Sequence, residues 1–236
     1  MTRKTASSAA AELAPQSAPP KLASERIRET ARRMFYEDGI RAVGVDALVA
    51  EAGVTKPSLY RSFSSKDELA ASYLRDYEGE FWAKFNEGAA LYPDDPRAAL
   101  MVYFERLAQR SAGKRAQPVS DRVVPDEAFM APATTRYRGC GLTNAVVEYP
   151  EPDHPAHQVA VTHKAALRAR MVELATAMGA AEPAILADGL VLLLEGAFVS
   201  GQIFGEGGPA RYLPEVASRL IDASMASPKS AAPLKR

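Results

Sequence analysis

The sequence has only one cysteine, Cys140, among its 236 residues. A single thiol cannot form an intramolecular disulfide, so the chain is not a disulfide scaffold, and its cysteine usage fits the reducing cytoplasm. Residues 1–20 contain no apolar run, which argues against a signal peptide. The most apolar stretch, 185–204, carries two acidic residues and lacks flanking basic residues. We interpret it as a buried helix and expect a cytoplasmic protein without a membrane partner.

An excess of positive charge is also missing, because 29 lysines and arginines balance 29 aspartates and glutamates. Nucleic-acid-binding proteins are typically basic, so the total argues at first against that class. The regions differ, however: residues 1–20 and 21–70 each carry a net +1, residues 71–226 carry −5, and the last ten residues carry +3. The zero total therefore does not exclude DNA. It predicts modest non-specific affinity and a shallow salt dependence.

No segment shows the alternating pattern of a strand, and apolar residues recur at helical spacing instead, which predicts an all-α fold. We expect a disordered tail (1–20), a small helical domain (21–68), a larger helical domain (69–226) and a second disordered tail (227–236). The irregular stretch 112–137 is either a functional loop or mobile. The predicted helices cover 24–38, 46–52, 56–63, a long segment starting after Ser65, 95–111, 142–148, 154–178, 183–204 and 212–226.

Two helix starts carry recognisable caps. Ser65 and Glu68 form a capping box, in which Glu68 is placed to return to the N–H of Ser65. Asp153 is expected to cap the helix that begins at residue 154. In the long fourth helix an apolar side chain stands at every fourth position, which predicts one buried face: Leu69, Tyr73, Tyr77, Phe81 and Phe85.

Residues 46–63 combine a short apolar-faced helix, a glycine turn and a second short helix with a polar outer face. This order is typical of a helix-turn-helix, whose second helix enters the major groove of DNA with small and polar side chains at its N-terminal end. Leu59 and Phe63 are assigned to the core. The pattern alone also fits two short helices at the edge of any helical domain. The polar candidates for DNA contacts are Thr55, Lys56, Ser58 and Arg61.

Residues 24–70 resemble the N-terminal domain of the TetR family of transcriptional repressors. The resemblance rests on Phe35 and Gly39, on the run from Leu48 to Val54, on the run from Leu59 to Phe63, and on the run from Ser65 to Leu69. Gly44 departs from the family, which frequently has serine or threonine there. The all-helical remainder has a suitable length for the family but matches it weakly in sequence.

The resemblance implies roles for individual side chains. Tyr60 would place its hydroxyl on a backbone phosphate, and Lys66, at the amino end of the fourth helix, would contact a second one. Arg61 has the planar fork that suits guanine, whereas Lys56 and Ser58 can reach base edges or phosphates. Thr55 is also a candidate N-cap. A double-stranded DNA operator is therefore the expected partner.

The resemblance further implies a homodimer that responds to a small molecule of unknown identity and acts as a repressor. The helix 183–204 is apolar nearly all round and needs burial on more than one side. We expect it to pair with the last helix and with their copies in a second subunit, although a deep core within one chain is the alternative. The predicted interface residues are Leu190, Leu194, Ala197, Phe198, Gly201, Val216, Leu220 and Ile221.

For a ligand pocket the sequence offers aromatic residues on two helices and a few polar residues on apolar faces. Such stripes also form ordinary core. The candidates are Trp82, Phe85, Tyr103, Phe104, Asn144, Glu148 and His163.

Metal, cofactor and catalytic sites are not expected. Cys140, Glu148 and the three histidines are capable ligands, but no pair shows the His-x3-His or Cys-x2-Cys spacing of a metal site. A redox switch at Cys140 requires an exposed, acidified thiol. Two rival classes stay open: a helical protein whose helix-turn-helix docks to protein, and a helical enzyme that pairs Cys140 with a histidine.

Overall fold

The computed structural model describes residues 21–111 and 137–225, and every regular element in these ranges is a helix, which confirms the all-α class. The expected disordered tails and nearly all of the stretch 112–137 lie outside the described residues. The elements in chain order are α1 (Ala23–Asp38), α2 (Val45–Glu51), α3 (Lys56–Ser62), α4 (Lys66–Ala90), α5 (Pro96–Ser111), α6 (Gly141–Glu148), α7 (Pro155–Ala177), α8 (Pro183–Phe204), the short 3-10 helix η1 (Pro209–Tyr212) and α9 (Leu213–Met225).

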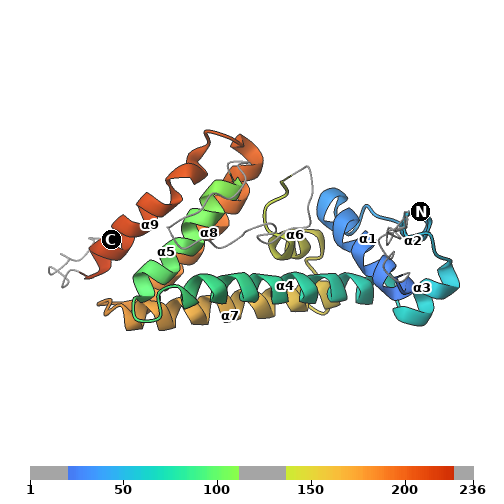
Figure 1. Cartoon of the computed structure of the whole chain (residues 1–236), viewed down its shortest axis with the longest axis horizontal. Helices are drawn as coiled ribbons and strands as arrows, with labels where there is room; N and C mark the ends of the chain where they lie inside the picture. Colours follow the sequence, from blue (N-terminus) through green and yellow to red (C-terminus); the bar gives the residue numbers. More distant parts are fainter. Residues whose placement is uncertain (1–20, 112–136, 226–236) are drawn as a thin grey trace, which may run out of the picture.

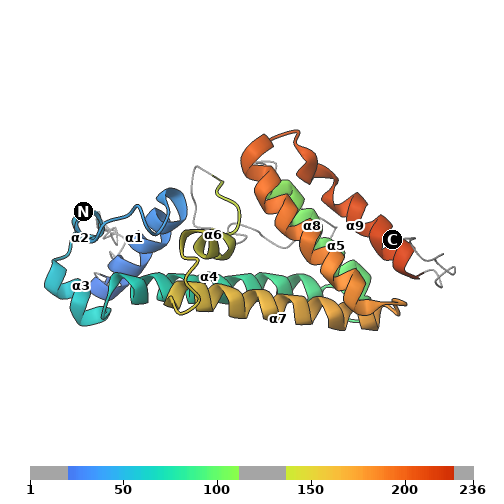
Figure 2. The same cartoon turned by 180° about the vertical axis from the view of Figure 1, so that it is seen from behind.

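The helices form an elongated molecule with three parts (Figure 1). At one end α1, α2 and α3 pack on one another, and at the other end α5, α8 and α9 do the same. The long helices α4 and α7 lie side by side and join the two ends, as the view from behind also shows (Figure 2). The short helix α6 packs on α4 and α7 between the two ends.

The first helix stops where its sequence supplies a glycine. α1 buries Ile27, Ala31 and Phe35 at helical spacing, and Gly39 then takes a φ of +93°, a conformation that side chains rarely adopt. The site is also tight, since a Cβ at Gly39 would lie 3.1 Å from a carboxylate oxygen of Glu148. The glycine thus serves both the turn and the approach of α6.

Two of the predicted capping details are wrong. The Ser65 hydroxyl does accept from the Glu68 N–H (3.0 Å), but the Glu68 carboxylate pairs with Arg75 instead of returning to Ser65. α7 is capped by His154, whose Nδ1 accepts from the Ala156 N–H at 3.2 Å, and not by Asp153. In the first case Arg75 takes the Glu68 carboxylate, and in the second His154 takes the N–H group that a cap would bind. The predicted buried row of α4, from Leu69 to Phe85, is confirmed.

The C-terminal end differs from the expected single last helix, because η1 precedes α9. Among the described residues, α8 is the one helix long and apolar enough to cross a membrane, a test that core helices of globular proteins also pass. It contacts α5, α7 and α9. Leu190, Leu194 and Phe198 are buried by these contacts, whereas apolar side chains on its other side are exposed.

Candidate nucleic-acid interface

The helix α3 is anchored on one side and open to solvent on the other. Leu59 is fully buried and Phe63 packs against the same core, as predicted. The predicted DNA-contacting residues of this segment lie on the solvent side: Thr55, Lys56, Tyr60 and Arg61 are exposed and Ser58 is half-buried. The anchor therefore fixes the helix while its polar side remains accessible.

Three of these polar side chains are connected to one another. Thr55 caps α3, because its hydroxyl accepts from the Ser58 N–H at 3.3 Å and lies 3.1 Å from the Ser58 hydroxyl. Arg61 Nη2 donates to the Ser58 hydroxyl at 2.9 Å. The guanidinium is thus held across the first turn of α3, which reduces the rotamer freedom that it would lose on contacting a base.

A carboxylate of the neighbouring helix holds Lys56. Its Nζ lies 2.6 Å from Asp46 Oδ1 of α2, and hydrogen bonding to this carboxylate raises the pKa of Lys56. Both side chains are exposed, so their ion pair contributes little free energy. A DNA phosphate can therefore replace Asp46 as the partner of Lys56 at small cost.

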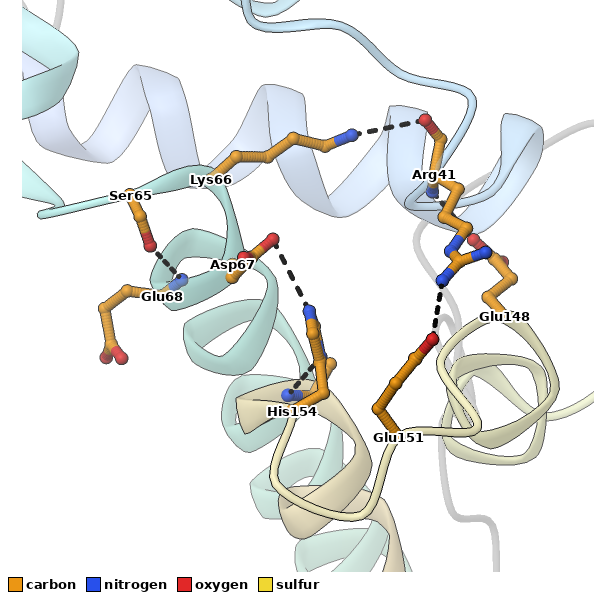
Figure 3. Close-up of polar contacts among 9 residues, drawn as sticks. Arg41, Ser65, Lys66, Asp67, Glu68, Glu148, Glu151 and His154 are labelled. Carbon is orange, nitrogen blue, oxygen red and sulfur yellow. Dashed lines mark hydrogen bonds and ion pairs between the residues drawn. The ribbon is translucent and has the colours of Figure 1, made fainter.

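The lysine at the start of α4 is less free than the sequence suggested. Lys66 is half-buried, its Nζ donates to the backbone oxygen of Arg41 at 3.3 Å (Figure 3), and burial lowers its pKa. Its phosphate contact stays a prediction, and it requires the amine to leave this carbonyl.

Lys66 belongs to a group of polar residues at which the three N-terminal helices meet the rest of the chain (Figure 3). The Arg41 N–H donates to Glu148 Oε2 (2.8 Å), and its guanidinium lies 3.4 Å from Glu151 Oε1. His154 Nε2 lies 3.5 Å from Asp67 Oδ1. We call this group the junction cluster; its members are Arg41, Lys66, Asp67, Glu148, Glu151 and His154. Glu148, a predicted pocket residue, is therefore found at the junction and not among the aromatic candidates.

A second contact between the N-terminal helices and the rest of the chain is centred on Tyr36 of α1. Its hydroxyl donates to the backbone oxygen of Gly139 (3.1 Å) and accepts from the Arg138 N–H (3.0 Å) and from Arg110 Nη2 (3.3 Å). Asn144, another pocket candidate, donates to the Arg138 oxygen at 2.7 Å. The segment before α6 is thus tied to α1 by hydrogen bonds between the Tyr36 side chain and main-chain atoms of Arg138 and Gly139.

Five predicted pocket residues do come together, around Phe81. The ring of His163 lies 4.6 Å from that of Phe81 and 5.5 Å from that of Trp82, while Phe85 and Tyr103 are 5.3 Å apart and Tyr103 and Phe104 are 6.1 Å apart. Burial lowers the pKa of His163 to about 4, so its ring is neutral at pH 7. The group has the close edge-to-face contacts of packed aromatic core.

The cysteine lies inside the protein, next to a lysine. Cys140 is buried, and Lys164 Nζ lies 3.5 Å from its sulfur and 2.5 Å from Glu195 Oε1, whose second oxygen accepts from Thr143. The exposure that a redox switch requires is not met in this conformation. No group of three potential metal ligands occurs in the part of the chain that the structure describes.

Most of the predicted interface residues are buried within one chain. Val216 is exposed and Leu220 half-buried, but the packing among α5, α7, α8 and α9 buries the other six: Leu190, Leu194, Ala197, Phe198, Gly201 and Ile221. Their contact with a second subunit stays a prediction. The apolar side chains that do reach solvent on these two helices are Ile185, Leu192, Val199, Ile203, Phe204 and Val216.

Comparison with known proteins agrees with the helix-turn-helix geometry. Residues 27–73 match the family model described as bacterial regulatory proteins, tetR family. The whole fold is similar to a TetR-family transcriptional regulator from Streptomyces coelicolor, with a TM-score of 0.68 and 27% identity over 86% of this chain and 94% of that one. Residues 27–73 thus match the N-terminal domain of the TetR family, and the whole fold is similar to that of TetR-family regulators. A family member from Streptomyces avermitilis is equally similar, with a TM-score of 0.67 and 28% identity over 86% of this chain and 98% of that one.

Two curated transcriptional regulators match part of the chain. The transcriptional activator FasR of Mycolicibacterium smegmatis is 32% identical over 88 residues, which is 36% of this chain and 40% of that protein. The regulator YjdC of Escherichia coli is 33% identical over 100 residues, which is 42% of this chain and 48% of that protein. The chain thus covers less than half the length of these relatives.

The sequence did not reveal the residues that connect the N-terminal helices to the rest of the chain. Tyr36, Arg41, Asp67 and Arg110 each look like ordinary helix or loop residues, because their partners are distant in the chain. Of the residues at these contacts, Gly39 was noted in the sequence, but only as the end of the first helix. Its position did not indicate that Glu148 lies beside it.

Proposed function

We propose that this protein is a homodimeric transcriptional regulator that binds a near-palindromic DNA operator through α3 and is released by a small-molecule effector. The observation that carries the proposal is the exposed polar side of α3, with Arg61 held by Ser58 and Lys56 held only by an exposed carboxylate. The match of residues 27–73 to the TetR family model supports the same surface. In helix-turn-helix dimers, two recognition helices enter successive major grooves about 34–36 Å apart, so a near-palindromic operator is expected.

The dimer is supported by an apolar face that one chain leaves uncovered. Ile185, Leu192 and Val199 repeat every seven residues along α8, and Ile203 continues the row; Leu192 is 74% exposed. A Cβ at Gly196, within this row, would meet nothing within 4 Å, so another helix can approach closely. Val216 extends the face onto α9. A second copy of this chain would bury the face on both sides, as the interface of a homodimer requires.

Release by an effector needs a route from the C-terminal helices to α3. α4 starts next to α3, and the junction cluster ties that start to α6 and α7. A ligand that binds better when these contacts are rearranged would lower the DNA affinity by the same free energy. We propose repression as the mode of action, although FasR, which is 32% identical over 88 residues, is named an activator.

The DNA claim is tested by titrating labelled promoter DNA from the protein's own locus, at several salt concentrations. Arg61→Ala is expected to weaken binding about tenfold and to relax the sequence preference, because a bidentate base contact is lost. Asp46→Asn is expected to strengthen binding several-fold for every sequence, since it frees Lys56 and removes a negative charge. The control is Glu173→Gln, the same change in charge on the exposed side of α7.

Two results would contradict the proposal. Binding that does not depend on salt, or no binding, would favour a helix-turn-helix that docks to protein. Equal effects of Asp46→Asn and Glu173→Gln would remove α3 from the interface.

A further inference from the structure

Two buried tyrosines on α4 have hydroxyl groups without a hydrogen-bond partner. Tyr73 is 4% exposed and Tyr77 is 2% exposed, and neither hydroxyl is bonded to any group in the described ranges. A buried hydroxyl normally has a partner, because it has given up its hydrogen bonds to water. Phenylalanine would fill the same space without this cost, so the two hydroxyls call for a functional explanation.

The same place receives the N-terminal end of α6. A Cβ added at Gly141, the first residue of α6, would lie 2.7 Å from the Tyr73 hydroxyl and 3.4 Å from the Tyr77 ring. Gly141 and Leu142 are buried, and the N-cap residue Cys140 gives α6 no side-chain cap. The first N–H groups of a helix carry partial positive charge, and the start of α6 lies beside the Tyr73 hydroxyl and the Tyr77 ring.

A cation without a carboxylate partner lies in the same region. Arg110 donates to the Tyr36 hydroxyl, and its guanidinium lies 5.7 Å from the centre of the Tyr137 ring. Among the described residues no carboxylate is within ion-pair distance of Arg110, whereas Lys164 nearby is paired with Glu195. The charge of Arg110 also acts on Tyr77, since it opposes part of the rise in pKa that burial gives this phenol.

We propose that Tyr73, Tyr77, Arg110 and the N-terminal end of α6 bind the carboxylate group of a small organic acid, and that such an acid is the effector. This inference rests on the proposed function, which requires an effector. A carboxylate accepts from phenol hydroxyls, from backbone N–H groups and from a guanidinium. One unpaired positive charge matches a monoanion, whereas a doubly charged phosphate would leave a buried negative charge uncompensated.

The position of this site explains how binding reaches the DNA-binding end. Arg110 is bonded to Tyr36 of α1, so an acid that takes the guanidinium competes with this contact. α6 begins at the site and ends at Glu148, which accepts from the Arg41 N–H in the junction cluster. Binding of an anion, with a shift of α6 toward it, therefore acts on both the bond from Arg110 to Tyr36 and the bond from Arg41 to Glu148.

The test measures binding of benzoate, acetate and the neutral analogue benzamide to the full chain by calorimetry and by thermal shift. Benzoate and acetate should bind and raise the melting temperature, and benzamide should bind at least tenfold more weakly than benzoate. Tyr77→Phe should weaken benzoate at least tenfold, because hydrogen bonds to a charged group are the strong ones. The control is Tyr212→Phe, which removes an exposed hydroxyl elsewhere.

The ligand-free proteins supply a second readout. Tyr77→Phe should melt at the same temperature as the wild type or higher, because it removes an unpaired buried hydroxyl. No binding of either acid, equal binding of benzoate and benzamide, or unchanged benzoate affinity in Tyr77→Phe would overturn the proposal. A lower melting temperature of ligand-free Tyr77→Phe would assign the hydroxyl to the fold and overturn it as well.

Titration of promoter DNA without acid separates this claim from the proposed function. DNA binding by a protein that ignores both acids would leave the regulator intact and remove the acid site. Benzoate binding that depends on Tyr77, in a protein with no affinity for DNA, would leave the acid site intact and contradict the proposed regulator.

Discussion

At the scale of single residues, burial decides the charge state of His163. Its ring is 1% exposed and lies between Phe81 and Trp82. Glu78 Oε1 is 3.4 Å from Nδ1 without forming a hydrogen bond, and a carboxylate so close favours the protonated ring. Burial and the neighbouring Lys164 act in the opposite direction and dominate, which lowers the pKa of His163 to about 4.

This histidine makes stability depend on pH. In the unfolded chain His163 is protonated below about pH 6.5, whereas in the folded chain it is protonated only below about pH 4. The contribution of His163 to the free energy of unfolding is therefore complete above pH 6.5. It is lost as the pH falls to 4, and the loss is roughly 3 kcal/mol at most. Urea denaturation between pH 4 and 7 measures it. His163→Gln should lose this part of the slope; an identical slope in the variant would show that the histidine is protonated in the folded state.

At the scale of elements, the sequence predicted most helices to within two residues but few contacts between them. The spacing of apolar residues and the turns at Gly39 and Gly53 depend on neighbours in the chain, so they can be read locally. The side of α8 that faces a partner cannot be predicted from the local sequence, because the helix is apolar on nearly every side. Its core side is chosen by α5, α7 and α9, and the predicted row, Leu190 to Gly201, turned out to be that core.

The candidate site divides in the same way. The polar residues of α3 were predicted because one short segment contains all of them, from Thr55 to Arg61. The partner of Lys56 in α2, the carbonyl that holds Lys66 and the bond from Arg110 to Tyr36 depend on tertiary packing. No spacing in the sequence signals these pairs.

Two glycines test how the elements are joined. Gly39→Ala should destabilise the fold by about 1–3 kcal/mol, because φ is +93° and the Glu148 carboxylate must move. Gly79→Ala, at an open position on the exposed side of α4, should stabilise it by up to about 1 kcal/mol. Thermal or urea unfolding compares the two. A neutral effect of Gly39→Ala would mean that the turn between α1 and α2 is not constrained as described.

At the scale of the whole molecule, the exposed apolar face of α8 and α9 predicts association. Sedimentation at micromolar concentration should give a dimer for the wild type and a monomer for Leu192→Glu, because the interface would bury an unpaired charge. Val161→Glu is the matched control, since Val161 is also exposed but lies on α7. A monomeric wild type, or a dimeric Leu192→Glu, would place the contact between subunits elsewhere.

The most direct test of the central claim is a hydroxyl-radical footprint on promoter DNA from the protein's own locus. Two copies of α3 in successive major grooves should protect two half-sites on one face of the duplex, with centres about 34–36 Å apart. The half-sites should be near-palindromic, and Leu192→Glu should lose the paired protection. A single protected half-site, or no protection at protein concentrations that saturate binding, would contradict a dimeric regulator that reads DNA through α3.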